Sequence, residues 1–421
     1  MPFKSEFFNI VAERGFYNQC TDEAGFDAYL AQCEKTGTPA VAYYGSDPTG
    51  DSLHIGHIVP IMILRWFQKL GHKPVMLVGG ATARIGDPSG KDKLRPFMSE
   101  ETIARNIRGL KTSYMKFLRF DDSANGAVIV DNYDWFKDIG YLEFLRDVGT
   151  YYSVNRMLTM ESVKTRLERE QQMSFLEFNY QLLQGYDFCE LYQKYGCRAQ
   201  IAGSDQWGNI TSGTELGRRR HNVDLFGFTA PLITDASGKK MGKSEGNAVW
   251  INDDKLSAFD YYQYFRNVAD ADVGKCLRAF TELPMNEVRR LESLKDSEIN
   301  DAKKILAFEA TKICRGESEA QKAADTARKT FEEKTAAENL PTITINAAQL
   351  AAGFAVVDAF VALKLTASKG ETRRLMAQNG AKINDAVVGE SKTVFEKSDV
   401  RNGVIKLSAG KKKHAMVKID G

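Results

Sequence analysis

Long apolar runs, cysteine pairs and a secretion signal are all missing from this 421-residue sequence. No apolar stretch approaches the roughly 18 residues that would indicate a membrane span. The six cysteines are scattered without a C-x-x-C pair, which argues against a zinc ribbon and predicts free thiols. The first residues also lack the charged and then apolar pattern of a secretion signal. We therefore expect a cytoplasmic protein without a disulfide framework.

Charge is unevenly distributed along the chain, although the formal net charge is only +2. From Ala351 onward the sequence has 13 Lys and Arg against 7 Asp and Glu, so the remainder is slightly acidic. A basic tail is typical of a segment that meets a polyanion. Charge alone fits a solvated lysine-rich face equally well, and both interpretations stay open.

Strand and helix patterns alternate through the first half of the chain, which predicts an α/β fold with a parallel sheet and helices on both faces. Active sites of such sheets lie at the carboxyl ends of the strands. Pro60 falls in the second turn of one predicted helix, where it costs stability unless that helix is irregular. The predicted strands are 39–45, 73–80, 127–130 and 198–202, and the predicted helices are 54–70, 102–120, 142–146, 161–170, 174–195 and 207–220.

The second half of the chain has a different texture. Residues 255–333 are almost wholly helical in pattern, which indicates a bundle. A linker-like stretch precedes a small basic α/β unit, in which we expect a helix over 368–378 and short strands after a turn at Asn379-Gly380. These shifts divide the chain into domains at 1–235, 236–335 and 353–421, with a linker at 336–352.

Two of the chain's five histidines lie close together in the segment Ser52-Leu53-His54-Ile55-Gly56-His57. The segment stands at the start of a helix pattern, and a helix N-terminus attracts phosphate through unpaired N–H groups and a partial positive charge. Imidazoles add directed donors, and Gly56 allows a ligand to approach the backbone closely. By itself the segment also fits two surface histidines in a turn. Asp47-Pro48-Thr49 before it favours a phosphate site.

A second segment, Gly238-Lys239-Lys240-Met241-Gly242-Lys243-Ser244, places lysines and a hydroxyl on a glycine-punctuated loop. It is a near miss for a P-loop, because three residues rather than four separate its two glycines. No helix pattern follows it, so a lysine loop fits better than a rigid P-loop, and a plain surface turn is the alternative. The two segments lie about 180 residues apart in the sequence. We predict that the fold brings them together around one nucleoside triphosphate.

Polar residues also follow two of the predicted strands. The glycine-rich loop 79–91 contains Asp87, which could receive a cationic amine, while Lys91 and the nearby Arg95 could reach phosphates. The turn 202–209 contains Asp205, which could hydrogen-bond a ribose hydroxyl. An ordinary strand-to-helix loop is the alternative for the segment 79–91.

One predicted helix carries a polar stripe. On the helix 174–195, Tyr180, Gln184 and Asp187 have the spacing that places three side chains on one face. Three polar groups need partners if that face is buried, and a solvent-facing stripe is the alternative. Neighbouring apolar residues already supply a core face, which favours a buried polar site.

Taken in order, these segments resemble the class I aminoacyl-tRNA synthetases, and among them the bacterial type of tyrosyl-tRNA synthetase. His54–His57 is similar to the family's H-I-G-H signature, and 240–244 is similar to its K-M-S-K-S signature, with glycine in the middle position. The resemblance covers about residues 35 to 250 and resumes in the tail. It implies a Rossmann-like catalytic domain at 1–235, a helical anticodon-side domain at 236–335 and an S-four-like RNA-binding domain at 353–421.

The resemblance also implies roles for individual residues. Expected around tyrosine are Tyr43, Asp87, Tyr180, Gln184, Asp187 and Gln206, with Tyr43 and Asp187 at the phenol. Expected around ATP are Gly45, Asp47, Gly56, Gly203 and Asp205, with the two aspartates serving the ribose. Expected to act on the phosphates are Thr49, His54, His57, Lys91, Arg95, Lys240, Lys243 and Ser244. Expected to contact RNA are Lys369, Arg373, Arg374 and Lys382.

The implied partners are L-tyrosine, ATP with Mg²⁺, and tRNA(Tyr), without a tightly bound cofactor or a protein metal site. In the family, the region matching 131–160 helps to form a homodimer, although its aromatic residues could equally belong to a core. Ser46 stands where the family usually has an aromatic residue, and Tyr44 where a smaller residue is common. Both leave the adenosine contacts open.

Other functions stay open at this point. A synthetase of the same architecture could charge tryptophan, although Asp187 with Tyr43 suits a phenol hydroxyl better than an indole N–H. An RNA-binding protein could use a synthetase scaffold that no longer catalyses, although both signatures are intact. A small-molecule nucleotidyltransferase shares the histidine signature but is usually much shorter and has no RNA-binding tail.

Overall fold

The computed structural model describes residues 3–87, 98–244, 247–331, 340–401, 403–410 and 413–420. These residues form two compact units, one of Met1–Lys255 with Ala269–Ile299 and one of Leu256–Val268 with Asn300–Gly421. The helical segment predicted as one domain at 236–335 therefore belongs partly to each unit. Its helices differ in their packing partners, which a helix pattern in the sequence does not reveal.

The first unit is built on a six-stranded sheet with the strand order β1-β6-β5-β2-β3-β4. All neighbouring pairs are parallel except β1, a short edge strand antiparallel to β6. The strands are β1 (Gln19–Cys20), β2 (Val41–Ser46), β3 (Lys73–Val78), β4 (Val128–Asp131), β5 (Ala199–Gly203) and β6 (Phe226–Ala230). The predicted α/β class is confirmed. Chain order reverses at β2, and crevices at such reversals are where ligands bind in open parallel sheets.

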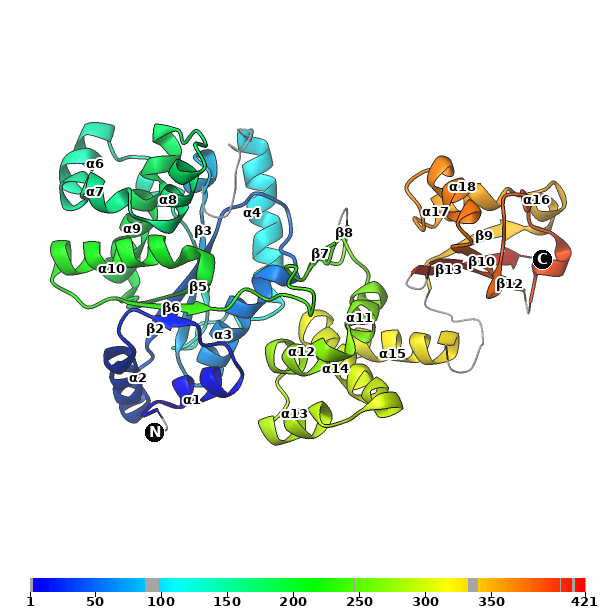
Figure 1. Ribbon diagram of the computed structural model, residues 1–421, viewed down its shortest axis with the longest axis horizontal. Coiled ribbons are helices and arrows are strands. Elements are labelled where there is room, and N and C mark those ends of the chain that lie inside the picture. Colours follow the sequence, from blue (N-terminus) through cyan, green and yellow to red (C-terminus); the bar gives the residue numbers. More distant parts are fainter. Residues whose placement is uncertain are drawn as a thin grey trace. The chain divides into compact units, whose positions relative to one another are not determined.

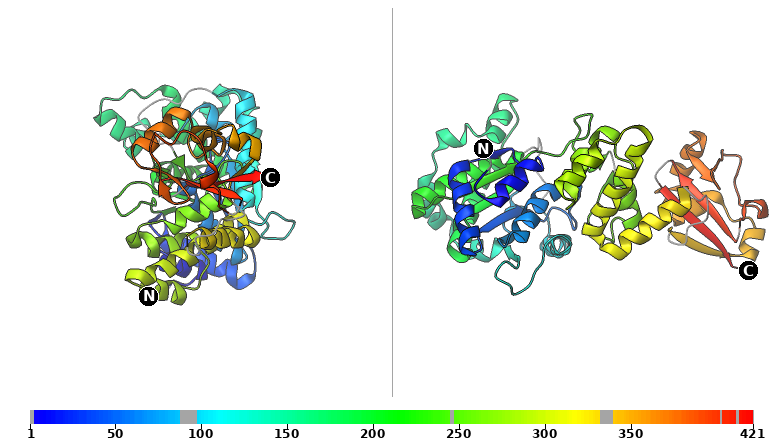
Figure 2. Two further views of the ribbon diagram at one scale, coloured as in Figure 1. Left: turned by 90° about the vertical axis from the view of Figure 1, so that its right-hand side faces the viewer. Right: turned by 90° about the horizontal axis from the view of Figure 1, so that it is seen from below.

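Helices cover both faces of this sheet (Figures 1 and 2). On one face, Tyr43, Val75 and Leu77 form a buried cluster with Phe188 and Leu216. Phe188 lies on α9 (Phe175–Tyr195) and Leu216 on α10 (Trp207–His221). Because strand side chains alternate between faces, this cluster uses every second residue of β3.

The opposite face is packed by aromatic rings from the N-terminal part of the chain. Phe7 contacts Phe67 and Phe228 with ring centroids 5.3 and 6.0 Å apart. These rings join α1 (Glu6–Glu13), α3 (Ile58–Lys69) and β6 across the sheet. Phe8 and Phe26 add a further edge-to-face pair, which brings in α2 (Glu23–Thr36).

Pro60 is accommodated because the helix after the histidine segment starts later than predicted. A 3₁₀ helix, η1 (Ile55–His57), comes first, and α3 begins only at Ile58. Pro60 therefore falls in the first turn of α3, where its missing N–H needs no intrahelical partner. The helix start is thus irregular, which is the condition under which Pro60 is tolerated there.

The first unit contains further helices between and after the strands of this sheet. They are α4 (Glu100–Met115), α5 (Tyr133–Phe136), α6 (Tyr141–Asp147), α7 (Val154–Met157), α8 (Glu161–Glu168), α12 (Val273–Phe280) and α13 (Met285–Glu292). The segment from α6 to α9 exposes several large apolar side chains, including Leu142 at 80% and Phe175 at 67%. None of the helices within the described ranges is long and apolar enough to cross a membrane.

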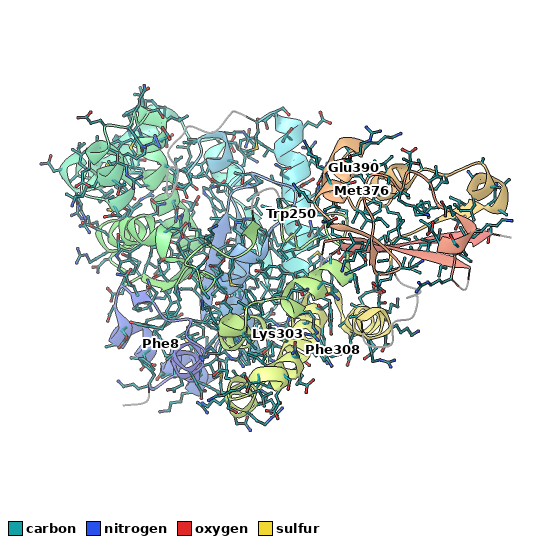
Figure 3. The ribbon with its side chains drawn as sticks, turned by 45° about the vertical axis from the view of Figure 1, so that its right-hand side comes forward. Phe8, Trp250, Lys303, Phe308, Met376 and Glu390 are labelled. Carbon is teal, nitrogen blue, oxygen red and sulfur yellow. The ribbon has the colours of Figure 1, made fainter. Side chains whose placement is uncertain are left out.

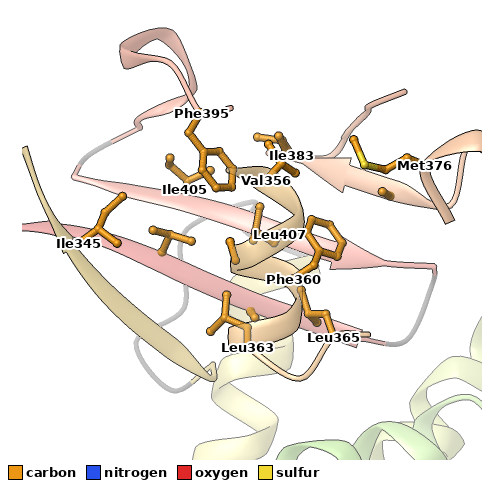
Figure 4. Close-up of a cluster of buried hydrophobic side chains, with 14 of the residues drawn as sticks. Ile345, Val356, Phe360, Leu363, Leu365, Met376, Ile383, Phe395, Ile405 and Leu407 are labelled. Atoms are coloured by element: carbon orange, nitrogen blue, oxygen red, sulfur yellow. The ribbon is translucent and has the colours of Figure 1, made fainter. Parts of the chain in front are cut away.

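The second unit contains α11 (Ala258–Arg266), α14 (Ile299–Arg315), α15 (Glu317–Phe331) and a small α+β domain. The domain's sheet has the order β11-β10-β12-β13-β9, with the helices α16 (Ala347–Ala351), α17 (Val356–Ala362) and α18 (Lys369–Ala377). Phe360, Phe395 and Leu407 lie in its core (Figure 4). Its strands are β9 (Thr342–Asn346), β10 (Ala381–Ile383), β11 (Ala386–Val387), β12 (Val404–Ala409) and β13 (Lys413–Asp420).

The structure differs from the predicted linker at 336–352. Residues 342–346 form β9, which pairs in parallel with β13, and Ile345 is buried in the small domain. The stretch T-I-T-I-N alternates polar and apolar residues, which is the pattern of a half-buried strand. Its partner lies some 70 residues later in the sequence, so only the tertiary structure shows the pairing.

Candidate active site

A cavity of about 480 Å³ opens at the carboxyl ends of β2 and β5. Most of the residues predicted for tyrosine, ATP and phosphate line it. They are Tyr43, Gly45, Asp47, Thr49, His54, Gly56, His57, Asp87, Tyr180, Gln184, Asp187, Gly203, Asp205, Gln206 and Lys240. Lys91 and Arg95 lie outside the described residues, and of Lys243 and Ser244 only the backbone is described, as β7 (Lys243–Ser244).

A buried carboxylate marks one end of this cavity. Asp187, on α9, is 2% exposed and accepts hydrogen bonds from Trp135 Nε1 at 2.9 Å and from Asn132 Nδ2 at 3.1 Å. Burial raises the pKa of Asp187 well above its usual range, although these two bonds oppose that shift. Tyr43 lies on β2, and its hydroxyl is buried without a hydrogen-bond partner among the described residues. A ligand hydroxyl would complete this pair, because buried polar groups rarely stay unpaired.

Asn132 and Trp135, the two residues that donate to Asp187, are not among the site residues predicted from the sequence. Asn132 follows β4 directly and donates to both Asp187 and Thr82. The rule that strand ends carry site residues points to Asn132, since it follows a predicted strand. Trp135 lies in the region 131–160, whose aromatic residues the sequence leaves open between a dimer interface and a core, and its indole N–H donates to Asp187.

The polar stripe on α9 faces the cavity, as predicted, and is tied to the strand ends. Tyr180 donates from its hydroxyl to Asp47 Oδ2 at 3.1 Å, and Thr82 donates to Asp47 Oδ1 at 2.6 Å. Gln206 donates to Asp87 Oδ2 at 2.9 Å. Asp47 is expected at the ribose together with Asp205, and its two carboxylate oxygens accept from Tyr180 and Thr82. Its position after β2 sets it opposite α9.

The two histidines are held by the backbone around them. His54 Nδ1 accepts from Gly56 N at 3.1 Å, and His57 Nδ1 accepts from His54 N at 3.3 Å. The ring centroids lie 4.0 Å apart. Because Nδ1 accepts in both rings, the hydrogen bonds assign the neutral tautomer with its proton on Nε2, which suits donation to an anion.

The lysine segment lies directly against the histidine segment, as predicted. Thr234 and Lys240 form an antiparallel bridge at the base of a hairpin. Gly242 has φ +85°, and a Cβ at this position would lie 2.1 Å from Ile55 Cγ2 and 3.2 Å from Gly56 N. Glycine in the middle of this signature therefore allows the two backbones to approach each other.

A buried asparagine after the lysine segment completes this arrangement, and the sequence reasoning missed it. Asn252 donates through Nδ2 to Gly109 O at 2.9 Å and accepts from Ser113 Oγ at 2.8 Å, both on α4. Its backbone N–H donates to Ser52 Oγ at 3.1 Å, just before His54. The strand β8 (Asn247–Ala248) precedes it. A single asparagine of this kind cannot be recognised in the sequence, because its role depends on hydrogen-bond partners in distant segments.

Trp250 closes the same side of the cavity (labelled in Figure 3). Its ring lies edge-to-face with His54 at a centroid distance of 6.1 Å, and the two residues form a β-bridge. The departure at Ser46 also has a structural counterpart, since its hydroxyl hydrogen-bonds the hydroxyl of Tyr114, a fully buried residue of α4. The side chain of Tyr114 thus reaches position 46, where the family usually has an aromatic residue.

The acids and the cation near the strand ends influence one another. Burial raises the pKa of Asp205, whereas the nearby Lys240 lowers it and Asp87 raises it. The ammonium group of Lys240 therefore interacts electrostatically with Asp205, the residue expected at the ribose. The described part of the chain contains no group of three or more His, Cys, Asp or Glu that could hold a metal ion.

The residues expected to contact RNA lie on the small domain. Arg373 and Arg374 are exposed on α18, and Lys382 is partly exposed on β10. Lys369 is exposed as well and forms an ion pair with Asp358 at 2.5 Å. Ser368 caps the helix, since its hydroxyl accepts from Glu371 N at 3.2 Å.

The profile of the class I tRNA synthetases of the W and Y group matches residues 35–332. The chain belongs to this family. It is 51% identical to the tyrosine–tRNA ligase of Rhodospirillum rubrum over 99% of its own length and 98% of that protein. It is 50% identical to the tyrosine–tRNA ligase of Wolbachia sp. subsp. Brugia malayi, with full coverage of both chains.

Solved structures agree with this family membership. A C-terminally truncated Aspergillus nidulans mitochondrial tyrosyl-tRNA synthetase superposes with a TM-score of 0.69 at 30% identity. The superposition covers 77% of this chain and 94% of that one. The Rossmann-like class I architecture inferred from the two signatures is thereby confirmed.

Proposed function

We propose that this chain is a tyrosine–tRNA ligase. It joins L-tyrosine to ATP, forming tyrosyl-adenylate and pyrophosphate, and then transfers the tyrosyl group to the 3'-terminal ribose of tRNA(Tyr). The observation that carries this proposal is the shape of one cavity. A buried acid and a buried hydroxyl that lacks a hydrogen-bond partner among the described residues line it together with two imidazoles and a lysine.

Activation needs positioning rather than a general base. The carboxylate of tyrosine is already ionised at neutral pH, so its oxygen attacks the α-phosphorus of ATP directly. A new P–O bond forms, the bond between the α-phosphorus and the bridging oxygen breaks, and pyrophosphate leaves. Negative charge builds up on the departing group, and cationic or N–H donors aimed at it lower the barrier.

The assignments follow from the placement of each group. Asp187 and Tyr43 bind the phenol, while Tyr180, Gln184, Asp87 and Gln206 bind the amino-acid head group. Asp47 orients Tyr180, and Asp205 binds the ribose, with Gly45, Gly56 and Gly203 as close backbone contacts. Thr49, His54, His57 and Lys240 bind the phosphates, and we assign Lys91, Arg95, Lys243 and Ser244 to the same task. Mg²⁺ enters with ATP and supplies further charge on its phosphates.

Rejection of phenylalanine follows from the same pair. Phenylalanine would leave Asp187 and Tyr43 buried without the ligand hydroxyl, and leaving buried polar groups unpaired costs affinity. Tyrosyl-tRNA synthetases reject phenylalanine in this way without an editing step. Tryptophan lacks a phenol hydroxyl, so the same argument disfavours it.

Transfer of the tyrosyl group requires tRNA, and we assign the small domain to its binding. A terminal ribose hydroxyl attacks the carbonyl carbon of the adenylate, an ester forms, and AMP leaves. The exposed Arg373 and Arg374 on α18, with Lys369 and Lys382, present cationic groups suited to phosphates. We place the enzyme in the cytoplasm, where ATP and tRNA are available.

We also propose that the enzyme is a homodimer. The exposed apolar side chains between α5 and α9 would be covered by a second copy, since monomers rarely expose such patches. Leu142, Tyr141 and Phe175 are more than half exposed. Light scattering is expected to give twice the chain mass, and Leu142→Asp is expected to give monomers.

The first experiment is exchange of labelled pyrophosphate into ATP with tyrosine, tryptophan and phenylalanine side by side. We expect exchange with tyrosine only. Exchange with tryptophan would show that Tyr43 and Asp187 do not select for a phenol hydroxyl. Absence of exchange with all three would favour an RNA-binding protein on a synthetase scaffold.

A second experiment separates the two half-reactions. Deleting residues 340–421 is expected to leave tyrosine-dependent exchange intact and to lower charging of tRNA(Tyr) by at least tenfold. The cut is placed before β9, because a cut within this strand would leave part of it without its partner β13. Unchanged charging by the truncated enzyme would refute the role of the tail.

A further inference from the structure

We propose that Asp272 is a positioning residue that sets Lys240 for the phosphates of ATP. The proposal rests on the proposed function, because it takes Lys240 to be a phosphate ligand. Asp272 does not line the cavity. It acts on the hairpin 233–241, whose base is the bridge between Thr234 and Lys240.

The hairpin is closed by its own bonds. Asp235 Oδ1 accepts from Ser237 N at 2.9 Å and from Lys239 N at 3.0 Å. Met241 N donates to Ile233 O at 2.9 Å. These bonds give the hairpin its form, but none of them fixes where it lies relative to the cavity. Bonds to residues outside the hairpin are needed for that.

Asp272 supplies such a bond from the start of α12. Its Oδ2 accepts from Ala236 N at 3.0 Å, and its carboxylate is only 3% exposed. Lys275, one turn later, donates from Nζ to Thr234 O at 2.6 Å and lies 3.3 Å from Asp272 Oδ1. The pair therefore holds the hairpin at two backbone points, one in the turn and one at its base.

The direction of the Asp272 side chain supports this role. Asp272 is the N-cap residue of α12, where an aspartate usually accepts from the backbone of its own helix. Here the side chain makes no capping bond and turns to Ala236 instead. A residue of the right type for a local cap is thus committed to a segment 36 positions earlier in the chain.

The helix α12 is itself fixed to the helix that follows the histidines. Glu282, just beyond α12, pairs with Arg65 Nε at 2.8 Å and with Lys69 Nζ at 3.1 Å, both on α3. Arg14 donates to the backbone carbonyls of Thr281 at 3.0 Å and Leu283 at 2.6 Å. The two helices α3 and α12 thereby form one frame. The frame carries the histidines at the start of α3 and the lysine hairpin at the start of α12.

The consequence is a defined place for the Lys240 ammonium group. Displacements of about 1 Å in a site that works by positioning lower rates up to about 100-fold. Loss of one of two backbone anchors allows a smaller displacement. We therefore expect Asp272→Ala to lower kcat/KM for ATP about tenfold in tyrosine-dependent pyrophosphate exchange, with little change in KM for tyrosine.

The matched control is Asp27→Ala. Asp27 is also a buried aspartate of the first unit, and it accepts from Lys4 N at 2.9 Å and Ser5 N at 2.8 Å, far in the sequence from both signatures. Both variants are expected to lower thermal stability, but only Asp272→Ala is expected to change ATP kinetics. Asp272→Asn keeps an acceptor oxygen of the same shape and is expected within about threefold of wild type.

Two further measurements test the route through Lys240. In a Lys240→Ala background, Asp272→Ala is expected to have less than a twofold effect, because a positioning residue has nothing left to position. Backbone amide exchange across 233–241 is expected to be faster in Asp272→Ala and unchanged in Asp27→Ala. The exchange experiment requires no enzymatic activity.

The outcomes separate this proposal from the proposed function. Absence of tyrosine-dependent exchange in the wild type would overturn the function. Asp272 would then be judged by equilibrium dialysis with ATP alone, in which Asp272→Ala is expected to weaken binding. The positioning role is overturned if Asp272→Ala matches Asp27→Ala in ATP kinetics or dialysis, or if its effect persists in full without Lys240.

Discussion

The two edges of the six-stranded sheet use polar side chains in opposite ways. At the carboxyl edge, the buried hydroxyl of Tyr43 has no hydrogen-bond partner in the described part of the chain, and His54 and Lys240 line an open cavity. At the amino edge, His72 is buried just before β3, accepts from Ala40 N at 3.3 Å and packs against Phe67. The polar side chains at the carboxyl edge line a cavity, whereas the imidazole of His72 at the amino edge is buried inside the fold.

This difference shows how a single sheet separates activity from stability. Parallel strands collect their carboxyl ends at one edge, and loops of variable sequence follow them there. At the amino edge the ring of His72 is enclosed by the fold, with Ala40 N and Phe67 against it. Substitutions at the carboxyl edge should therefore change catalysis more than stability, and the reverse should hold at the amino edge.

The largest expected effect is at His54. Replacing His54 by alanine removes a donor aimed at the phosphates, so we expect the rate of tyrosine activation to fall about 100-fold or more. The dissociation constant for tyrosine should stay within about twofold, since the phenol end is untouched. Pre-steady-state formation of tyrosyl-adenylate measures the rate, and equilibrium dialysis measures binding. Equal losses in both would remove the phosphate role.

A somewhat smaller effect is expected at Gly242. Alanine there adds a Cβ that would lie 2.1 Å from Ile55 Cγ2, and it must also adopt a positive φ. We expect activation to slow about tenfold because the two signatures are forced apart. Gly238→Ala is the matched control, since φ is +82° but no atom lies within 4 Å of the added Cβ. If both variants lose activity equally, backbone strain alone is responsible.

At the phenol end, Tyr43→Phe is expected to lower kcat/KM for tyrosine about tenfold and to weaken the rejection of phenylalanine. The loss corresponds to one hydrogen bond in a buried site. Tyr152→Phe is the control, because its hydroxyl is also buried without a partner among the described residues but does not line this cavity. Pyrophosphate exchange with both amino acids gives the ratio. An unchanged ratio in Tyr43→Phe would contradict the assignment.

The smallest expected effect on activity is at the amino edge. Burial lowers the pKa of His72 from 6.5 to about 4, despite a Glu34 carboxylate 3.7 Å from Nε2. Below pH 6.5 the His72 imidazole binds a proton in the unfolded chain, whereas in the folded chain it stays neutral down to about pH 4. The contribution of His72 to the free energy of unfolding is therefore fully present above pH 6.5, and about 2–3 kcal/mol of it is lost as the pH drops to 4.

His72→Asn tests this behaviour. Asparagine does not titrate, so the fall in the free energy of unfolding between pH 6.5 and 4 should become shallower by this amount, as measured by urea unfolding at each pH. Activation of tyrosine at neutral pH should stay within about twofold of wild type. An unaltered pH profile would show that other groups cause the loss, and a large loss of activity would break the contrast between the edges.

Much of the site could be predicted because its residues follow local patterns. Strand ends, a helix start and one helical face are visible over short stretches, and these patterns located His54, Asp187 and Asp205. Pro60 even indicated an irregular helix start. The same strand-end rule points to Asn132, which directly follows β4. Asn252 and Asp272 could not be found in this way, because each acts through partners 36 or more positions away.

The sequence by itself determined the class of fold and four of the six strands of the first unit's sheet, and it indicated which side chains could hold a phenol and a triphosphate. Those features depend on short-range periodicity and on the chemistry of single residue types. Only the tertiary structure decided that Asp47 serves Tyr180, that β9 belongs to the small domain and that Asp272 anchors the lysine hairpin. Each of these depends on hydrogen bonds between segments distant in sequence, whose geometry local preferences do not specify.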